Sequence, residues 1–253
     1  MDHKQYSRNG ILRYERIFGA GFVSTGGVDT TLMFLKGLDL QPGQKVLDVG
    51  CGIGGGDFFM AKEYKVEVIG MDLSSNMVGI AYERAQEEAN KELKCHFEIG
   101  DITKQNFPNG YFDVIYSRDT LLHIADKKKL FAQFKDWLKP GGKVFITDYC
   151  CGPKPWSDEF AVYVAERGYS LLTPAEYGDI FKGLNYTHVR ADEVTHIFVD
   201  CLNKELKKLA EVKDAFVADF SLEDYNYLVE GWEAKKKRCA AGYQKWGLFY
   251  VEK

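Results

Sequence analysis

The chain has 253 residues, of which 45% are hydrophobic, and this suits one domain with embellishments or one large and one small lobe. A net charge of −4 and a pI near 5.8 argue against a nucleic-acid partner, and no apolar run reaches the ~20 residues of a membrane span. The six cysteines have no metal-ligand spacing, and the first residues have no apolar signal region. We therefore expect reduced thiols, a cytoplasmic location and no metal. We also expect a monomer without a membrane partner.

The first predicted helix covers residues 11–18, where apolar side chains recur at helical spacing and predict one buried face. Gly19-Ala-Gly21 is expected to end this helix, and residues 24–27 to form a turn. A helix around 28–38 should follow. We interpret residues 1–27 as a lid over a ligand. Its candidate contacts are Gln5, Tyr6, Tyr14 and Ser24.

A strand, a glycine turn and a helix are predicted at residues 45–64. The apolar run 46–49 stops at glycines 50, 52, 54, 55 and 56, and a helix-like segment begins at Asp57. Such a unit brings bare backbone close to a nucleotide-like ligand. Glycines 50, 52 and 55 satisfy the dinucleotide spacing G-x-G-x-x-G, while glycines 50, 52 and 54 satisfy the methyltransferase spacing G-x-G-x-G. The spacing alone leaves NAD and S-adenosylmethionine (SAM) open.

The next two predicted strands each end in an acid. Asp72 closes the strand 66–72, twenty positions after Gly52, where a carboxylate can take both ribose hydroxyls of either cofactor. Asp101 closes the strand 95–101 and suits an adenine amino group. Its context, Gly100-Asp101-Ile102, resembles class I methyltransferases, as do Asp48 and residues 137–142, which favours SAM. Between the two strands we expect a helix capped by Ser74 or Ser75 and running through Glu88.

A fourth strand, 112–117, runs into Arg118, Asp119 and, four residues later, His123. Ligands of an open parallel sheet lie beyond the carboxyl ends of its strands, so these three side chains are expected at the reaction site. On one helical turn, Asp119 and His123 would share a face. A helix at 127–138, a turn at 139–142 and a fifth strand at 143–149 should follow.

Residues 150–172 are too many for a simple loop after strand five. They carry Tyr163, Arg167 and Tyr169, a composition typical of a substrate cap. Thr173-Pro-Ala-Glu176 predicts a capping box. Strands are expected at 186–194 and 246–251, with a charged helical region between them. Within it, residues 235–238 (Lys-Lys-Lys-Arg) are interpreted as a solvated helix face, from which one lysine could turn inward.

Taken together, these motifs resemble the phosphoethanolamine N-methyltransferase family. The stretches that carry the resemblance are Gln5-Tyr6, 14–19, 22–27, 117–123, 146–150, 167–169, Trp232 and 244–249. The likeness covers nearly the whole chain and is closest to the C-terminal half of the plant tandem enzymes, then to the single-domain protozoan ones. It implies an α/β class I methyltransferase fold with a Rossmann-like, doubly wound, seven-stranded sheet. One domain would span 1–253, with the lid at 1–27 and a helical cap at 150–172 inserted after strand five.

The resemblance also implies roles for individual residues. Cofactor-binding positions are Ser24, Asp48, Gly50, Gly52, Asp72, Leu73, Asp101, Ile102 and Arg118. Positions that hold the substrate phosphate are Tyr149, Tyr163, Arg167, Tyr169 and Lys235, with Tyr14 nearby in the lid. Tyr6 and His123 match a catalytic pair that latches over the amine, with Gln5 and Asp119 beside it. The implied reaction transfers methyl groups from SAM to phosphoethanolamine and/or its mono- and dimethyl forms, leading to phosphocholine.

The residue chemistry agrees with that reaction. A phosphate dianion can be held by Arg167 and tyrosine hydroxyls without a metal. The substrate amine, with a pKa near the lysine value of ~10.4, must lose a proton before it attacks, and His123 at ~6.5 is the expected acceptor. Two alternatives stay open. One is a methyltransferase for an apolar acceptor such as a sterol or fatty chain, against which the Arg/Tyr cap argues. The other is a non-catalytic SAM-binding half of a tandem enzyme.

Overall fold

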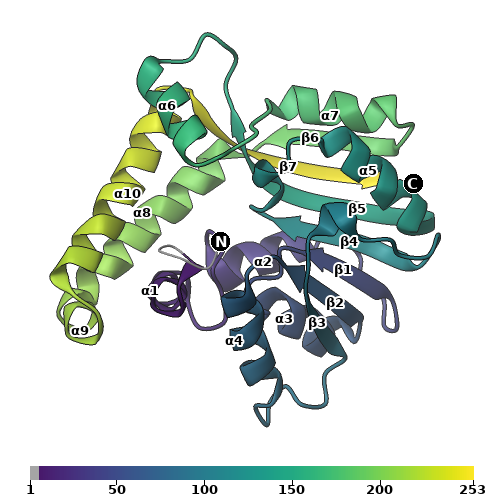
Figure 1. Ribbon diagram of the computed structural model, residues 1–253, viewed down its shortest axis with the longest axis horizontal. Coiled ribbons are helices and arrows are strands. Elements are labelled where there is room, and N and C mark those ends of the chain that lie inside the picture. Colours follow the sequence, from purple (N-terminus) through teal and green to yellow (C-terminus); the bar gives the residue numbers. More distant parts are fainter. Residues whose placement is uncertain (1–5) are drawn as a thin grey trace.

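A computed structural model describes residues 6–253 and has a seven-stranded sheet at its centre (Figure 1). The strands are β1 (Lys45–Val49), β2 (Glu67–Asp72), β3 (Cys95–Ile99), β4 (Phe112–Arg118), β5 (Leu138–Cys151), β6 (Thr187–Glu193) and β7 (Gln244–Glu252). Their order is β3-β2-β1-β4-β5-β7-β6, with β7 antiparallel to both neighbours and all other pairs parallel. The strand order reverses between β1 and β4, which is where open α/β sheets bind ligands. The predicted doubly wound sheet is confirmed.

Helices cover both faces of the sheet. On one face lie α2 (Gly27–Leu35), α3 (Gly55–Tyr64) and α8 (Thr195–Glu211), and on the other lie α5 (Lys127–Trp137) and α7 (Pro174–Gly183). The helix α4 (Ser75–Ala85) packs against β2 and β3. Adjacent residues of β1 enter different cores, Val46 with α2 and α8 and Leu47 with α5 and α7. This follows from the two-residue period of a strand buried on both faces.

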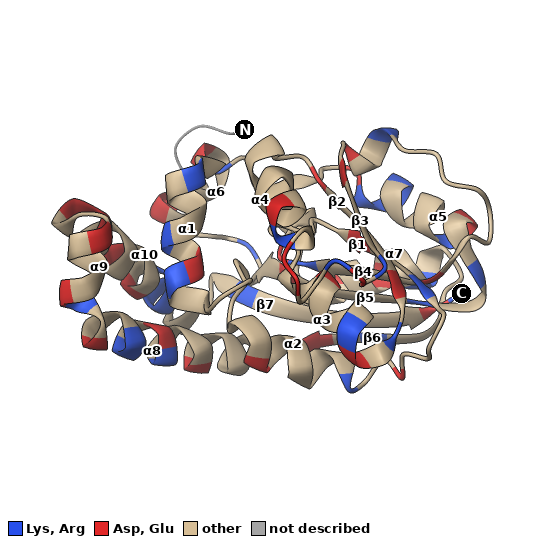
Figure 2. Ribbon diagram, turned by 90° about the horizontal axis from the view of Figure 1, so that it is seen from below, with Lys and Arg blue, Asp and Glu red and all other residues tan. Residues whose placement is uncertain are grey.

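A helical lobe extends beyond the sheet and brings α1, from the start of the described chain, next to the late helix α10 (Figure 1). It contains α1 (Arg8–Phe18), α6 (Asp158–Glu166), α9 (Lys213–Asp219), α10 (Leu222–Ala240) and the far end of α8. Tyr14 and Phe18 of α1 lie against Trp232 of α10, with ring centroids 5.9 and 5.7 Å apart. Basic and acidic residues are interspersed along the outer helices α8, α9 and α10 (Figure 2). Within residues 6–253, no helix combines the length and apolarity that a membrane crossing requires.

The predicted element types hold along the chain, whereas several boundaries differ by a few residues. The helix expected through Glu88 ends at Ala85, where the side-chain amide of Asn90 donates to the carbonyl of Arg84 and satisfies the helix end. The turn expected at 139–142 is instead part of β5, which begins at Leu138 because that residue already pairs with Phe112 before a register shift. The capping box of α7 is confirmed.

Candidate active site

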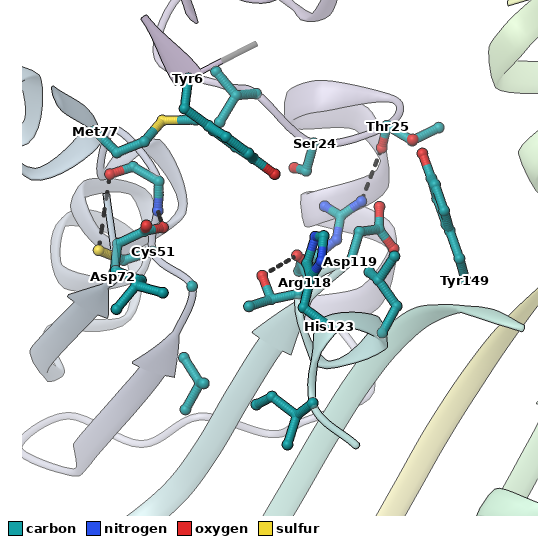
Figure 3. A pocket seen from close by; sticks show the side chains of 18 of the residues that line it. Tyr6, Ser24, Thr25, Cys51, Asp72, Met77, Arg118, Asp119, His123 and Tyr149 are labelled. Atoms are coloured by element: carbon teal, nitrogen blue, oxygen red, sulfur yellow. Dashed lines mark hydrogen bonds between the residues drawn. The ribbon is translucent and has the colours of Figure 1, made fainter. Parts of the chain in front are cut away.

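A cavity of about 1010 Å³ lies at the carboxyl ends of β1, β2 and β4 (Figure 3). Its walls come from the N-terminal segment, the glycine turn, the loop after β4, residues 163–169 and α10. Every predicted site residue except Gln5 lines it, and Gln5 lies outside the described residues. The fold therefore gathers predicted site residues that are up to 229 positions apart in sequence, from Tyr6 to Lys235. The individual roles of these residues stay predictions.

The glycine turn after β1 leaves no room for side chains. A Cβ atom at Gly50, where φ is +83°, would lie 2.0 Å from Oγ1 of Thr120 in the loop after β4. One at Gly55 would lie 2.0 Å from the carbonyl oxygen of Gly21 in the N-terminal segment. Neighbouring segments thus approach the bare backbone directly, which only glycine permits.

The acids at the ends of β2 and β3 are held by backbone N–H groups. Asp72 accepts hydrogen bonds from the N–H of Gly52 at 3.0 Å and of Ser74 at 2.9 Å. Asp101 caps a short 3-10 turn by accepting from the N–H of Thr103 at 3.0 Å, and the hydrogen bonds from Thr103 lower the pKa of this carboxyl group. A carboxylate has about four acceptor sites, so both acids retain the capacity to bind ligand hydroxyl or amino groups.

A second acid, not predicted as a site residue, lies beside Asp48 beneath the glycine turn. Asp57 lies in the first turn of α3 and is completely buried. Burial raises the pKa of Asp48 to about 7, while burial and the charge of Asp48 raise that of Asp57 well above its usual range. Two buried carboxyl groups disfavour double ionisation, so this pair tends to retain a proton.

Arg118 mainly supports the wall of the cavity. Its guanidinium group is buried and donates to the carbonyl of Thr25 at 2.8 Å and to the hydroxyls of Thr30 and Thr31 at 3.0 Å. A fourth bond reaches Thr147 at 3.3 Å. Because four of the five guanidinium N–H groups bind protein, the side chain is less available to a cofactor than the sequence suggested. Figure 3 shows Arg118 turned toward Thr25.

Asp119 is not part of a helical turn, so the expected helical face shared with His123 is wrong. Asp119 has a left-handed φ of 53°, and its N–H bonds the carbonyl of Thr147 on β5 at 2.7 Å, whereas the 3-10 turn begins at Leu121. Its Oδ1 accepts from the indole N–H of Trp246 at 2.7 Å. Its Oδ2 is buried without a hydrogen-bond partner among the described residues, which leaves an acceptor for a ligand. Burial raises the pKa of Asp119, opposed by the charge of Arg118.

His123 lies in the same loop, with its ring centroid 5.2 Å from that of Tyr169. Burial and the cationic groups of Lys127 and Arg167 lower its pKa, so the imidazole is neutral at pH 7. Tyr6 extends into the cavity from the N-terminal segment (Figure 3), and burial followed by the charge of Asp72 raises its pKa. Within residues 6–253, no hydrogen bond joins Tyr6 to His123, and their catalytic pairing stays a prediction.

The far end of the cavity is rich in tyrosine and cationic groups. The guanidinium carbon of Arg167 lies 5.8 Å from the ring centroid of Tyr163. The ammonium group of Lys235 lies 5.9 Å from that of Tyr149 and 4.0 Å from that of Trp232. Burial lowers the pKa of Lys235 to about 8, so this group is largely charged at pH 7.

The residues 235–238 are not simply a solvated helix face. Lys235 and Arg238, three positions apart on α10, both line the cavity, whereas Lys236 is near Glu233 and Lys237 is exposed. The sequence analysis missed Arg238, whose guanidinium carbon is 3.8 Å from the centroid of the Tyr163 ring. Arg238 follows Lys235 by three residues, a spacing that places two side chains on the same face of a helix, and this spacing could have predicted it.

The described residues contain no group of three His, Cys, Asp or Glu side chains arranged to hold a metal ion.

Comparisons with known proteins agree with this geometry. A family described as methyltransferase domain matches residues 46–142. The chain is 52% identical over its full length to phosphoethanolamine N-methyltransferase 1 of Arabidopsis thaliana, of which it covers 51%. It is 39% identical to the phosphoethanolamine N-methyltransferase of Plasmodium falciparum, of which it covers 95%.

A solved structure has the same architecture. Phosphoethanolamine N-methyltransferase 2 of Haemonchus contortus, in complex with phosphomonomethylethanolamine and S-adenosylhomocysteine, superimposes with a TM-score of 0.95 at 36% identity. The alignment covers all of this chain and 58% of that one. The chain thus spans about half the length of the plant and nematode relatives and nearly all of the Plasmodium one.

Proposed function

The chain belongs to the phosphoethanolamine N-methyltransferase family, and from this premise we propose that it methylates the amine of phosphoethanolamine and/or its mono- and dimethyl forms with SAM. The products would be S-adenosylhomocysteine and, finally, phosphocholine. The observation that carries the proposal is one cavity that joins the glycine turn to a cationic, tyrosine-rich end, with His123 in its wall.

The glycine-turn end fits the cofactor. Bound SAM supplies an electrophilic methyl group. The residues proposed to hold it are Ser24, Asp48, Gly50, Gly52, Asp72, Leu73, Asp101, Ile102 and Arg118. The oriented carboxylates of Asp72 and Asp101 suit ribose hydroxyls and an adenine amino group.

The opposite end fits a phosphate monoester. Arg167, Lys235 and Arg238 supply positive charge, and tyrosine hydroxyls supply further donors. Charge-assisted hydrogen bonds of this kind hold phosphate without a metal ion. The proposed tyrosines are Tyr14, Tyr149, Tyr163 and Tyr169. This concentration of charge disfavours an apolar acceptor.

The amine would lie between these ends. His123 is kept neutral by burial and by nearby cations, so it can accept a proton from the substrate ammonium group. The unpartnered Oδ2 of Asp119 can accept an N–H of that ammonium group. Tyr6, and Gln5 outside the described residues, would close over the amine. Once the proton has left, the nitrogen lone pair can attack the methyl group, and positioning provides much of the rate.

We also propose that 1–253 acts as one methyltransferase domain with a lid at 1–27 and a substrate cap at 150–172. The cap contains α6 and contributes Tyr163, Arg167 and Tyr169 to the cavity. We also propose that the protein is a monomer. Six unpaired cysteines support a cytoplasmic location.

The test is a methyl-transfer assay on phosphoethanolamine, its mono- and dimethyl forms and unphosphorylated ethanolamine. We expect turnover of the two partly methylated phosphobases and little of ethanolamine. Arg167→Met should raise KM for the phosphobase ~10-fold or more, the loss of one charged hydrogen-bond partner. Arg190→Met, at an exposed arginine on β6, is the control. SAM binding without turnover of any phosphobase would instead favour a non-catalytic half of a tandem enzyme.

A further inference from the structure

A buried lysine outside the predicted site joins two walls of the cavity. Lys127 is the first residue of α5, and only 2% of it is exposed. Its ammonium group donates to the carbonyl of Ile124 at 2.8 Å and to that of Ser170 at 2.6 Å. The N–H of Ser170 donates to the carbonyl of Leu122 at 2.7 Å. Three hydrogen bonds therefore tie residues 122–124 to Ser170.

These hydrogen bonds connect the loop that carries the proposed proton acceptor to the cap that carries the proposed phosphate-binding residues. His123 is the middle residue of the segment 122–124, and Tyr169 directly precedes Ser170. The rings of His123 and Tyr169 contact each other, with centroids 5.2 Å apart. Arg167 is three residues before Ser170. A shift of Ser170 would thus move the proton acceptor and the phosphate-binding residues relative to each other.

We propose that Lys127 is a positioning residue that holds the His123 loop against the cap, so that phosphate capture and placement of the proton acceptor are coupled. The inference deepens the proposed function and rests on it.

The surroundings of Lys127 explain how a buried ammonium group is tolerated. Burying a charge is costly unless it is paired and hydrogen-bonded. Lys127 has two carbonyl acceptors, and the carboxyl group of Asp148 on β5 favours its charged form. Asp148 is in turn hydrogen-bonded by the hydroxyl of Tyr177 from α7. The ammonium group of Lys127 also lies 5.7 Å from the centroid of the Tyr177 ring. The tie is therefore anchored in the core on one side of the sheet.

Lys127 also acts on His123 through its charge. The cationic groups that lower the pKa of His123, after burial, are Lys127 from α5 and Arg167 from the cap. Tyr169 lies against the ring, and Asp148 acts on Lys127 from β5. A neutral side chain at position 127 would remove one of the two positive charges. The pKa of His123 would then rise toward its ordinary value.

The chain offers a matched control for the experiment. Lys135 lies on the same helix and likewise donates to two backbone carbonyls, those of Leu184 at 2.7 Å and Asn185 at 2.6 Å. It does not line the cavity. Both Lys127→Met and Lys135→Met therefore remove an ammonium group that donates to two backbone carbonyls. Lys127→Met does so next to the site, and Lys135→Met does so away from it.

Two measurements are made on both variants and the wild type. One is the NMR titration of the His123 imidazole, with its signal assigned among the five histidines by a His123→Gln variant. The other is the pH dependence of kcat and KM with a phosphobase. Lys127→Met should raise the pKa of His123, shift the acid limb of kcat/KM to higher pH and lower kcat by ~10-fold or more, the cost of a misplaced group. SAM affinity should stay unchanged, and Lys135→Met should show none of these effects.

An unchanged His123 titration with wild-type kcat in Lys127→Met would overturn the inference. If Lys127→Met does not fold, Lys127→Arg carries the test, because it keeps the charge but alters the hydrogen-bond geometry. We expect it to lower kcat without raising the pKa of His123, and wild-type kcat would contradict the positioning role. A wild type that binds SAM but methylates no phosphobase would refute the proposed function. A pKa of His123 that rises in Lys127→Met would still show in that case that the charge of Lys127 acts on His123.

Discussion

Trp246→Phe offers a sharp test of how the site is built, because Trp246 supports Asp119 without lining the cavity. Trp246 is completely buried in β7, and its indole N–H donates to Oδ1 of Asp119 at 2.7 Å. Phenylalanine keeps one ring but removes the donor. Only the weaker contact from the hydroxyl of Thr147, at 3.3 Å, would still hold that oxygen.

The expected loss of stability follows from these contacts. A hydrogen bond to a charged group contributes about 1.5–3 kcal/mol, and the smaller ring costs roughly 1 kcal/mol more in packing. We therefore expect the free energy of unfolding to fall by about 2.5–4 kcal/mol. For a chain of this size that corresponds to a decrease in Tm of roughly 5–15 °C. Trp137→Phe, at another buried tryptophan that does not line the cavity, measures the packing part alone.

Trp246→Phe should change the kinetics with the phosphobase but not the binding of SAM. With Oδ1 released, Oδ2 of Asp119 is no longer oriented toward the ammonium group, and KM should rise by about tenfold, equivalent to 1.4 kcal/mol. The hydrogen bond from Trp246 also lowers the pKa of Asp119, so its loss raises that pKa. A carboxyl group is protonated below its pKa, so kcat/KM should begin to fall at a higher pH on acidification than in the wild type. SAM affinity should not change.

The assays are thermal unfolding, steady-state kinetics across pH and isothermal titration with SAM. If Trp246→Phe loses no more stability than Trp137→Phe and keeps the wild-type KM at each pH, Trp246 is only a packing residue, and the orientation of Asp119 has another cause.

Three further predictions concern the two ends of the cavity and the amine between them. Asp72→Ala should weaken SAM binding by ~1.5–3 kcal/mol in isothermal titration, the range for hydrogen bonds to a charged group; unchanged affinity in a folded variant would contradict its ribose-binding role. Since Lys235 loses its charge above a pKa of about 8, KM for the phosphobase should rise above that pH. Lys235→Met should raise KM and abolish this pH dependence. If the pH dependence persists in the variant, a group other than Lys235 causes it. His123→Ala should lower kcat ~10²-fold with little change in SAM affinity, and Tyr6→Phe should show a smaller parallel loss. Near-wild-type kcat in His123→Ala would place the proton acceptor elsewhere.

Much of the cavity wall formed by the glycine turn and the ends of β2 and β3 could be predicted from the sequence. A glycine cluster directly after a buried apolar strand has few structural uses, and acids at successive strand ends share one edge of a parallel sheet. These are local signals, since strand period, turn composition and short spacing are all visible within ~30 residues. The structure brings Gly50, Asp72 and Asp101 to one cavity accordingly. The seven-stranded sheet followed from the same signals and from the family resemblance.

Contacts between distant segments were decided only by the tertiary structure. Nothing near Asp119 in sequence indicates that Trp246, 127 positions later, donates to it. Arg118 was expected at the cofactor and lines the cavity, but the sequence gives no sign that its guanidinium group also donates to the carbonyl of Thr25. Arg238 was hidden in a run of cations, because the inward face of α10 is set by the packing of Trp232 against α1 and α8. Local sequence specifies backbone conformation, whereas burial and long-range hydrogen bonds choose which side chains face the ligand.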